Sequence, residues 1–215
     1  MRRLGGNRAG ELRLTRLLRN EAFSCEEMLA EAARRTSERC MGQHVLAIQD
    51  TTVVRSEGGG GEYLHAVLAL NAQDGAILGL IDGCFLERKG GRRAARRSTP
   101  IEEKESFRWL EGAEQAASVC AGAASVTVIA DRESDIFEAF ALRSEGVELL
   151  VRAAHDRALA DGQALFTRAD AMSAMGRAEL ELPAKPGRRA NASKMSLSRS
   201  AITVTPAAPA HTEAA

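Results

Sequence analysis

Residues 125–135 read SVTVIADRESD, an apolar run that ends in an aspartate and an acidic turn. This run predicts a buried strand over residues 125–130, so Asp131 lies where that strand emerges. Residues 44–52, HVLAIQDTT, repeat the arrangement and place Asp50 after a second apolar run. Either acid alone is more simply explained as a helix cap. Together they indicate a shared site for a divalent cation, because metal and ligand sites of open α/β sheets lie beyond the carboxyl ends of the strands.

The sequence on either side of these two runs predicts a mixed α/β protein. Charged and apolar residues alternate at helical spacing over residues 11–40, where Ser24 and Glu27 form a capping box that opens the second of two helices. The other predicted elements are, in order, strands at 45–48, 63–70 and 76–86, a helix at 101–120, a strand at 125–130, a helix at about 134–144, and strands at 147–153 and 177–182. The first three strands should form an antiparallel meander, and the β-α-β unit that follows should be parallel and right-handed.

The element order βββαβαβ is that of a ribonuclease-H-like fold. In such a sheet the first strand and the strand after the long helix are neighbours, so the fold is expected to bring Asp50 and Asp131 together. Towards the end of the chain the periodicity weakens, and residues 190–215 are rich in Ser, Ala, Thr and Pro. This composition predicts a disordered C-terminal tail.

Composition excludes several classes of protein. The formal net charge is zero, so there is no overall basic field, although arginines cluster at 88–97. The cysteines at 25, 40, 84 and 120 lack Cys-x-x-Cys spacing, so we expect neither a zinc site nor a disulfide framework, and reduced, mostly buried thiols. No apolar stretch approaches the ~18 residues that a membrane span needs. We therefore expect a cytoplasmic protein with no membrane association.

The chain resembles the bacterial DDE transposases of the insertion sequence four group. Five motifs carry the resemblance and keep their order over residues 12–182: AIQDTT at 47–52, YLHAVL at 63–68, EKES at 103–106 leading to Trp109-Leu110, DRESDI at 131–136, and the strand that ends at Val151-Arg152. The resemblance implies a ribonuclease-H-like core and a Mg²⁺-dependent enzyme that cuts and joins DNA at transposon ends. It also implies a bacterial protein that associates with the nucleoid when bound to DNA.

By this resemblance Asp50 and Asp131 correspond to the first two acids of the family's catalytic triad. Both would be catalytic and metal-binding residues: Asp50 would bridge two Mg²⁺ ions ~3.5 to 4 Å apart, and Asp131 would hold one of them. The family's third acid is a glutamate in a Tyr-x-x-Arg-x-x-x-Glu-x-x-x-x-x-x-Lys motif, and this chain contains no such motif. Because Mg²⁺ demands near-ideal octahedral geometry, we expect an incomplete two-metal site and impaired catalysis.

The same comparison predicts a chain that is truncated at both ends. Residues 1–43 would be a helical remnant of the N-terminal region, 44–176 a partial catalytic core, 177–189 the start of a β-rich insertion, and 190–215 the disordered tail. The partners implied are DNA and either a second copy or an intact transposase. A rival hypothesis is a catalytically dead fragment that binds DNA or inhibits full-length transposase, and a third is a decayed remnant that folds poorly.

Several other charged residues are candidates for the site. The candidate contacts to the DNA backbone, which would give salt-dependent binding, are Arg92, Arg93, Arg96, Arg97, Arg132 and Arg152. For Arg132, contact with phosphate and pairing with one of the acids both remain open. Glu133 and Asp135 could assist the metal, but acids in these positions more often favour a helix N-terminus through its dipole.

Overall fold

The computed structural model describes residues 6–57, 60–88, 100–187 and 189–204. The chain divides into two compact units, Met1–Arg152 and Ala153–Ala215, which we describe separately. The boundary between the units falls before residue 176, where the predicted core was expected to end.

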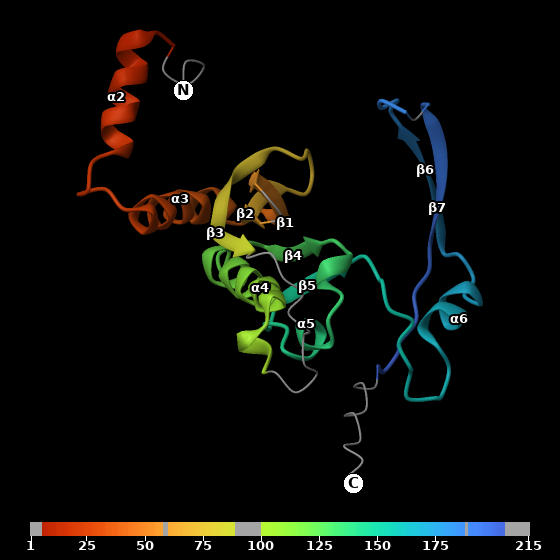
Figure 1. Ribbon diagram of the computed structural model, residues 1–215. Coiled ribbons are helices and arrows are strands. Elements are labelled where there is room, and N and C mark those ends of the chain that lie inside the picture. The colour runs from red at the N-terminus through yellow and green to blue at the C-terminus, as the bar shows by residue number, and fades with distance from the viewer. Residues whose placement is uncertain (1–5, 58–59, 89–99, 188, 205–215) are drawn as a thin grey trace. The chain divides into compact units, whose positions relative to one another are not determined.

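The first unit is built on a five-stranded mixed sheet with the order β3-β2-β1-β4-β5 (Figure 1). Its strands are β1 His44–Glu57, β2 Gly60–Asn71, β3 Ile77–Arg88, β4 Ser125–Ala130 and β5 Val147–Val151. The first three strands form the predicted antiparallel meander, while β4 pairs in parallel with both β1 and β5. The prediction that β1 and β4 are neighbours is therefore confirmed.

The helices of this unit differ in length from the sequence expectation. They are α2 Arg8–Leu18, α3 Cys25–Cys40, η1 Ile101–Glu103, η2 Glu105–Phe107, α4 Arg108–Val119, η3 Arg132–Ser134 and α5 Phe137–Ala141. The predicted capping box of Ser24 and Glu27 is present at the start of α3. The helix expected at 134–144 is reduced to α5, because Asp131 caps the short η3 and Ile136 is extended, which interrupts the helical backbone.

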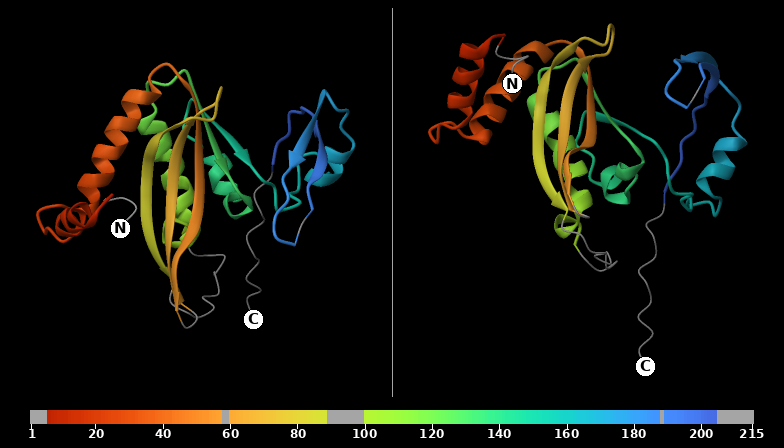
Figure 2. Two further views of the ribbon diagram at one scale, coloured as in Figure 1. Left: turned by 90° about the horizontal axis from the view of Figure 1, so that it is seen from above. Right: turned by 45° about the horizontal axis from the view of Figure 1, so that its top comes forward.

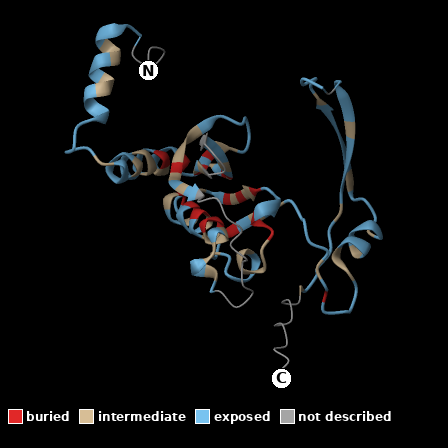
Figure 3. Cartoon of the chain, in the orientation of Figure 1, coloured by how far each residue is buried: buried red, intermediate tan, exposed pale blue. Residues whose placement is uncertain are grey.

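The core lies on one face of the sheet, where α4 packs against the strands (Figures 2 and 3). Alternate strand residues point into it, and the helices add small side chains. Its buried members are Cys40, Val45, Ala47, Val67, Ala69, Ile81, Ala116, Cys120, Val126, Val128 and Val147. Because side chains alternate between the faces of a strand, the residues between these positions lie on the opposite face. Trp109 is buried, as predicted.

The opposite face carries an apolar row that crosses all five strands. Cα pairing aligns Leu80 with Leu68, Leu68 with Ile48, Ile48 with Ile129, and Ile129 with Leu150. The row is less well covered than the core: Leu68 is 38% exposed and Leu150 is 59% exposed. Asp50 follows Ile48 on this same face.

The second unit contains α6 Leu165–Asp170 and a two-stranded hairpin of β6 Gly176–Leu182 and β7 Asn191–Leu197. Strand β6 matches the strand predicted at 177–182. The prediction of disorder from residue 190 is wrong for β7, because pairing with β6 satisfies the backbone groups of a segment whose composition is typical of disorder. Residues 205–215 lie outside the described part of the chain. No described helix has the length and apolar character to cross a bilayer.

Candidate functional site

Asp50 lies within β1, and Asp131 directly follows β4, the parallel neighbour of β1. Ile48 of β1 pairs with Ile129 of the parallel strand β4, and each acid follows its isoleucine by two residues. Because side chains repeat every two residues along a strand, Asp50 projects from the face that carries the apolar row, and the same alternation continued one residue past β4 places Asp131 on that side. Neighbouring strands are about 4.8 Å apart, so two side chains at the same level can reach one cation. Both acids are exposed to solvent.

Each carboxylate is oriented by a backbone N–H close by in its own strand or turn. The N–H of Thr51 donates to Oδ1 of Asp50 at 2.8 Å. The N–H of Glu133 donates to Oδ1 of Asp131 at 2.8 Å, which makes Asp131 the N-cap of η3. The helix-cap explanation considered for these acids thus holds for Asp131, which caps the short turn η3. It does not hold for Asp50, which lies within β1.

A buried polar network lies behind the acids, on the core side of the sheet. His65, 2% exposed, places Nδ1 2.9 Å from Thr51 Oγ1 and Nε2 3.2 Å from Gln49 Oε1. The amide of Gln49 donates to the Trp109 carbonyl at 3.3 Å, and Arg108 Nε donates to Thr51 Oγ1 at 3.2 Å. One donor pattern satisfies all four contacts: Thr51 donates to Nδ1, and the Nε2–H of His65 donates to Gln49.

The network keeps His65 neutral. Burial is the main cause that lowers the pKa of His65 to about 4, and the charge of Arg108 lowers it further. The charges of Asp82 and Asp50 act in the opposite direction. Its contacts with Thr51 and Gln49 inside the network indicate a structural role for this histidine.

Arg108 is the charged centre of the site, and sequence reasoning did not single it out. Its side chain is 6% exposed and donates to Glu133 Oε2 at 2.8 Å and to the Glu105 carbonyl at 2.6 Å. Its guanidinium also lies 5.0 Å from the ring centroid of Trp109. The only sequence signal was its place between EKES and Trp109 in the matched motif. Glu133 lies in the first turn of η3, as expected for an acid at a helix N-terminus, and with Glu105 it also forms an ion pair with Arg108.

The candidate DNA-contacting arginines fall into two groups. Arg92, Arg93, Arg96 and Arg97 lie outside the described residues. Arg132 and Arg152 are exposed. Ala130 pairs with Val151, so Arg152 follows β5 at the level at which Asp131 follows β4. Within the described ranges Arg132 forms no ion pair with either acid, so the structure does not bear out that alternative.

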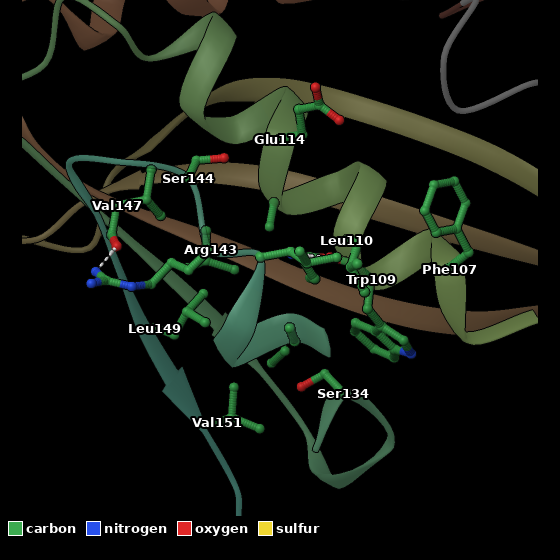
Figure 4. A pocket seen from close by; sticks show the side chains of 16 residues that line it. Phe107, Trp109, Leu110, Glu114, Ser134, Arg143, Ser144, Val147, Leu149 and Val151 are labelled. Carbon is green, nitrogen blue, oxygen red and sulfur yellow. Dashed lines mark hydrogen bonds between the residues drawn. The ribbon is translucent and has the colours of Figure 1, made fainter. Parts of the chain in front are cut away.

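A cavity of about 250 Å³ lies between the core face of the sheet, α4 and α5 (Figure 4). It is lined by core-facing strand residues such as Val128 and Ala130, by Leu110 of α4, and by Leu149 of β5. Arg143 donates to the Val147 carbonyl at its edge. Neither Asp50 nor Asp131 lines this cavity.

The donor set at the two acids fits one divalent cation. Mg²⁺ is commonly held by one or two carboxylates, with water and substrate phosphates as its other ligands. Among the residues that the structure describes, no group of three or more His, Cys, Asp or Glu side chains is arranged to hold a metal. The described residues therefore do not provide the further carboxylate that a second ion would need.

The fold is that of an α/β protein built on a five-stranded mixed sheet, in which Asp50 of β1 and Asp131 after β4 belong to neighbouring parallel strands. Comparisons with models of known protein families and with curated proteins find no match.

Proposed function

We propose that this chain carries the catalytic core of a DDE transposase of the insertion sequence four group, which cleaves and transfers DNA strands by Mg²⁺-dependent phosphodiester chemistry. The observation that carries the proposal is the pairing of Ile48 with Ile129 on the adjacent parallel strands β1 and β4, because each isoleucine stands two residues before one of the acids. The strand order β3-β2-β1-β4-β5, with an antiparallel first half, is compatible with a ribonuclease-H-like fold and supports it.

In this proposal Asp50 and Asp131 hold the cation. A bound Mg²⁺ supplies Lewis-acid polarisation of the phosphodiester. The chain's own contribution is to orient the two carboxylates through the N–H groups of Thr51 and Glu133. Arg132 and Arg152, exposed beside Asp131, supply positive charge for the DNA backbone.

Metal-dependent nicking of supercoiled plasmid DNA tests the proposal. We expect slow nicking in Mg²⁺ or Mn²⁺ by the full chain, and none by Asp50→Asn or Asp131→Asn. Asp74→Asn is the matched control, because Asp74 is also exposed and its Oδ1 also accepts a local backbone N–H, from Ala76 at 2.9 Å, but in the turn between β2 and β3. Nicking that persists in both acid variants, or that is absent from the unaltered chain, would contradict a catalytic role.

A second candidate function is DNA binding without chemistry, by a fragment that occupies DNA or associates with another copy or with intact transposase. The observation in its favour is that the described residues contain no group of three or more His, Cys, Asp or Glu side chains arranged to hold a metal, and that Asp131 already caps a turn. A gel-shift titration separates the two functions. Binding that weakens steeply with salt and is unchanged by Asp50→Asn, in a chain that does not nick DNA, supports the second candidate.

A further inference from the structure

Arg108 is a cation inside the protein, and its contacts reach both strands that carry the acids. Charged side chains are almost never buried unless they are paired. The Arg108 guanidinium is paired in this way. It donates hydrogen bonds to Glu133 on the turn after β4, to Thr51 on β1 and to the Glu105 carbonyl before α4. A planar guanidinium can hold several acceptors in fixed directions at once.

Two of these contacts end next to the candidate metal ligands. Thr51, whose hydroxyl accepts from Arg108, is the residue whose N–H donates to Asp50. Glu133, whose carboxylate accepts from Arg108, is the residue whose N–H donates to Asp131. One guanidinium therefore holds both residues that orient the acids.

We propose that Arg108 is a positioning residue that sets the separation and orientation of the Asp50 and Asp131 carboxylates. The inference rests on the proposed function, in which these two acids hold a divalent cation. Arg108 lies on the core side of the sheet and the acids on the other, so it acts through Thr51 and Glu133 and does not touch the ion. Groups that orient metal ligands commonly change metal affinity by about 10- to 100-fold when they are altered.

Two variants test this role without changing the charge of the site, although Thr51→Val also removes the hydroxyl that donates to His65 Nδ1. Arg108→Lys keeps the cation but replaces the planar fork by a single ammonium, which cannot serve Thr51 and Glu133 in the same geometry. Thr51→Val keeps the shape of the side chain and removes the hydroxyl that accepts from Arg108 Nε. Arg34→Lys, on an exposed arginine of α3 that pairs with Glu31, and Thr52→Val, on the next and exposed residue of β1, are the matched controls.

The experiment measures Mn²⁺ affinity of the full chain from the loss of the free-ion electron paramagnetic resonance signal, together with a thermal melt of each variant. We expect Arg108→Lys to bind Mn²⁺ about tenfold more weakly and Thr51→Val several-fold more weakly while both remain folded. Both controls should bind as the unaltered chain does. If Arg108→Lys does not fold, Thr51→Val decides the question.

Failure of the inference and failure of the proposed function give different results. If folded Arg108→Lys and Thr51→Val bind Mn²⁺ as tightly as the unaltered chain while Asp50→Asn loses binding, the positioning role is wrong and the metal site stands. If Arg108→Lys and Thr51→Val lower the melting temperature but leave the Mn²⁺ affinity unchanged, the positioning role is likewise wrong. If the unaltered chain does not bind Mn²⁺, or Asp50→Asn binds it equally well, the proposed site is wrong and the inference falls with it.

Discussion

The imidazole of His65 stands edge-on to the indole of Trp109, with ring centroids 4.6 Å apart and an interplanar angle of 82°. The contact joins β2 to α4 within the network that lies behind the two acids. An aromatic edge against a ring face is a favoured arrangement, and it encloses the imidazole away from water. The burial that results is the main reason why His65 resists protonation.

His65 should make the stability of the fold depend on pH. Its pKa is about 4 in the folded chain against an ordinary 6.5, so between these values the unfolded chain binds the proton and the folded chain does not. Stability from this group is complete above pH 6.5 and is lost as the pH falls towards 4. Between pH 7 and pH 5 we expect a loss on the order of 2 kcal/mol in the free energy of unfolding, measured in urea. In His65→Gln this loss should be smaller by about that amount; an equal loss in both proteins contradicts the prediction.

The four cysteines should divide into two reactive and two protected thiols. Cys40 and Cys120 are buried with their sulfur atoms 3.6 Å apart, and burial raises the pKa of Cys40 and raises that of Cys120 to about 12. Cys25 and Cys84 are exposed, which corrects the expectation of mostly buried thiols. Because the thiolate is the reactive form, alkylation at pH 8 followed by peptide mass spectrometry should label Cys25 first. Cys84 should follow more slowly, because partial burial and the charges of Asp82 and Glu111 raise its pKa, but it should still react before the buried pair. Equal labelling of all four thiols in the native chain would exclude this packing.

Gly112 should not tolerate alanine, although it lies inside α4. An added Cβ would lie 2.5 Å from Gln49 Oε1 and 3.1 Å from Val67 Cγ2. Gln49 is 3% exposed and is held by His65 and the Trp109 carbonyl, so it cannot move without breaking those contacts. The gain of about 1 kcal/mol in helix propensity is therefore outweighed, and we expect a net loss of about 1 to 2 kcal/mol on chemical denaturation.

Gly122→Ala is the control for that substitution. Its Cβ would also meet a side chain, the sulfur of Met41, but Met41 is 60% exposed and flexible enough to move aside. We expect a loss well below that of Gly112→Ala. A larger effect at Gly122 than at Gly112 would show that the Gln49 contact does not limit packing.

Val128 tests whether the core lies on the α4 side of the sheet. It is 1% exposed, whereas Val54 of β1 is 53% exposed. Val128→Ala should lower the free energy of unfolding by about 1.5 to 3 kcal/mol, through lost burial and the cavity left behind. Val54→Ala should lower it by less than about 1 kcal/mol. Similar losses at the two positions in thermal or urea unfolding would contradict the assigned faces.

Strand positions followed from sequence wherever apolar residues and turn signals were clear. The antiparallel meander, the 125–130 strand and the Ser24 capping box were predicted, because each depends on neighbours in the sequence. Strand β7 was missed since its residues are not apolar and its stability depends on β6. The 134–144 helix was overestimated, because helical periodicity continues through residues that instead form a capped turn and an extended Ile136.

The two acids of the site could be located from their place after apolar runs, but the residues that hold them could not. Arg108 is 57 residues from Thr51 and 25 from Glu133 along the chain. Arg108 is charged and lies in the first turn of α4, as many solvent-exposed surface arginines do. No local pattern distinguishes a buried guanidinium from an exposed one when its partners come from other elements.

Periodicity within short stretches of sequence was therefore enough to identify the strands and the acids that follow apolar runs. The order of the predicted elements was enough to predict that β1 and β4 are neighbours. The register of β1 against β4, the burial of Arg108 and the lowered pKa of His65 arise only when the strands and α4 come together. These features depend on contacts between distant segments and on the exclusion of water from the space between them, and neither is encoded in any one stretch of residues.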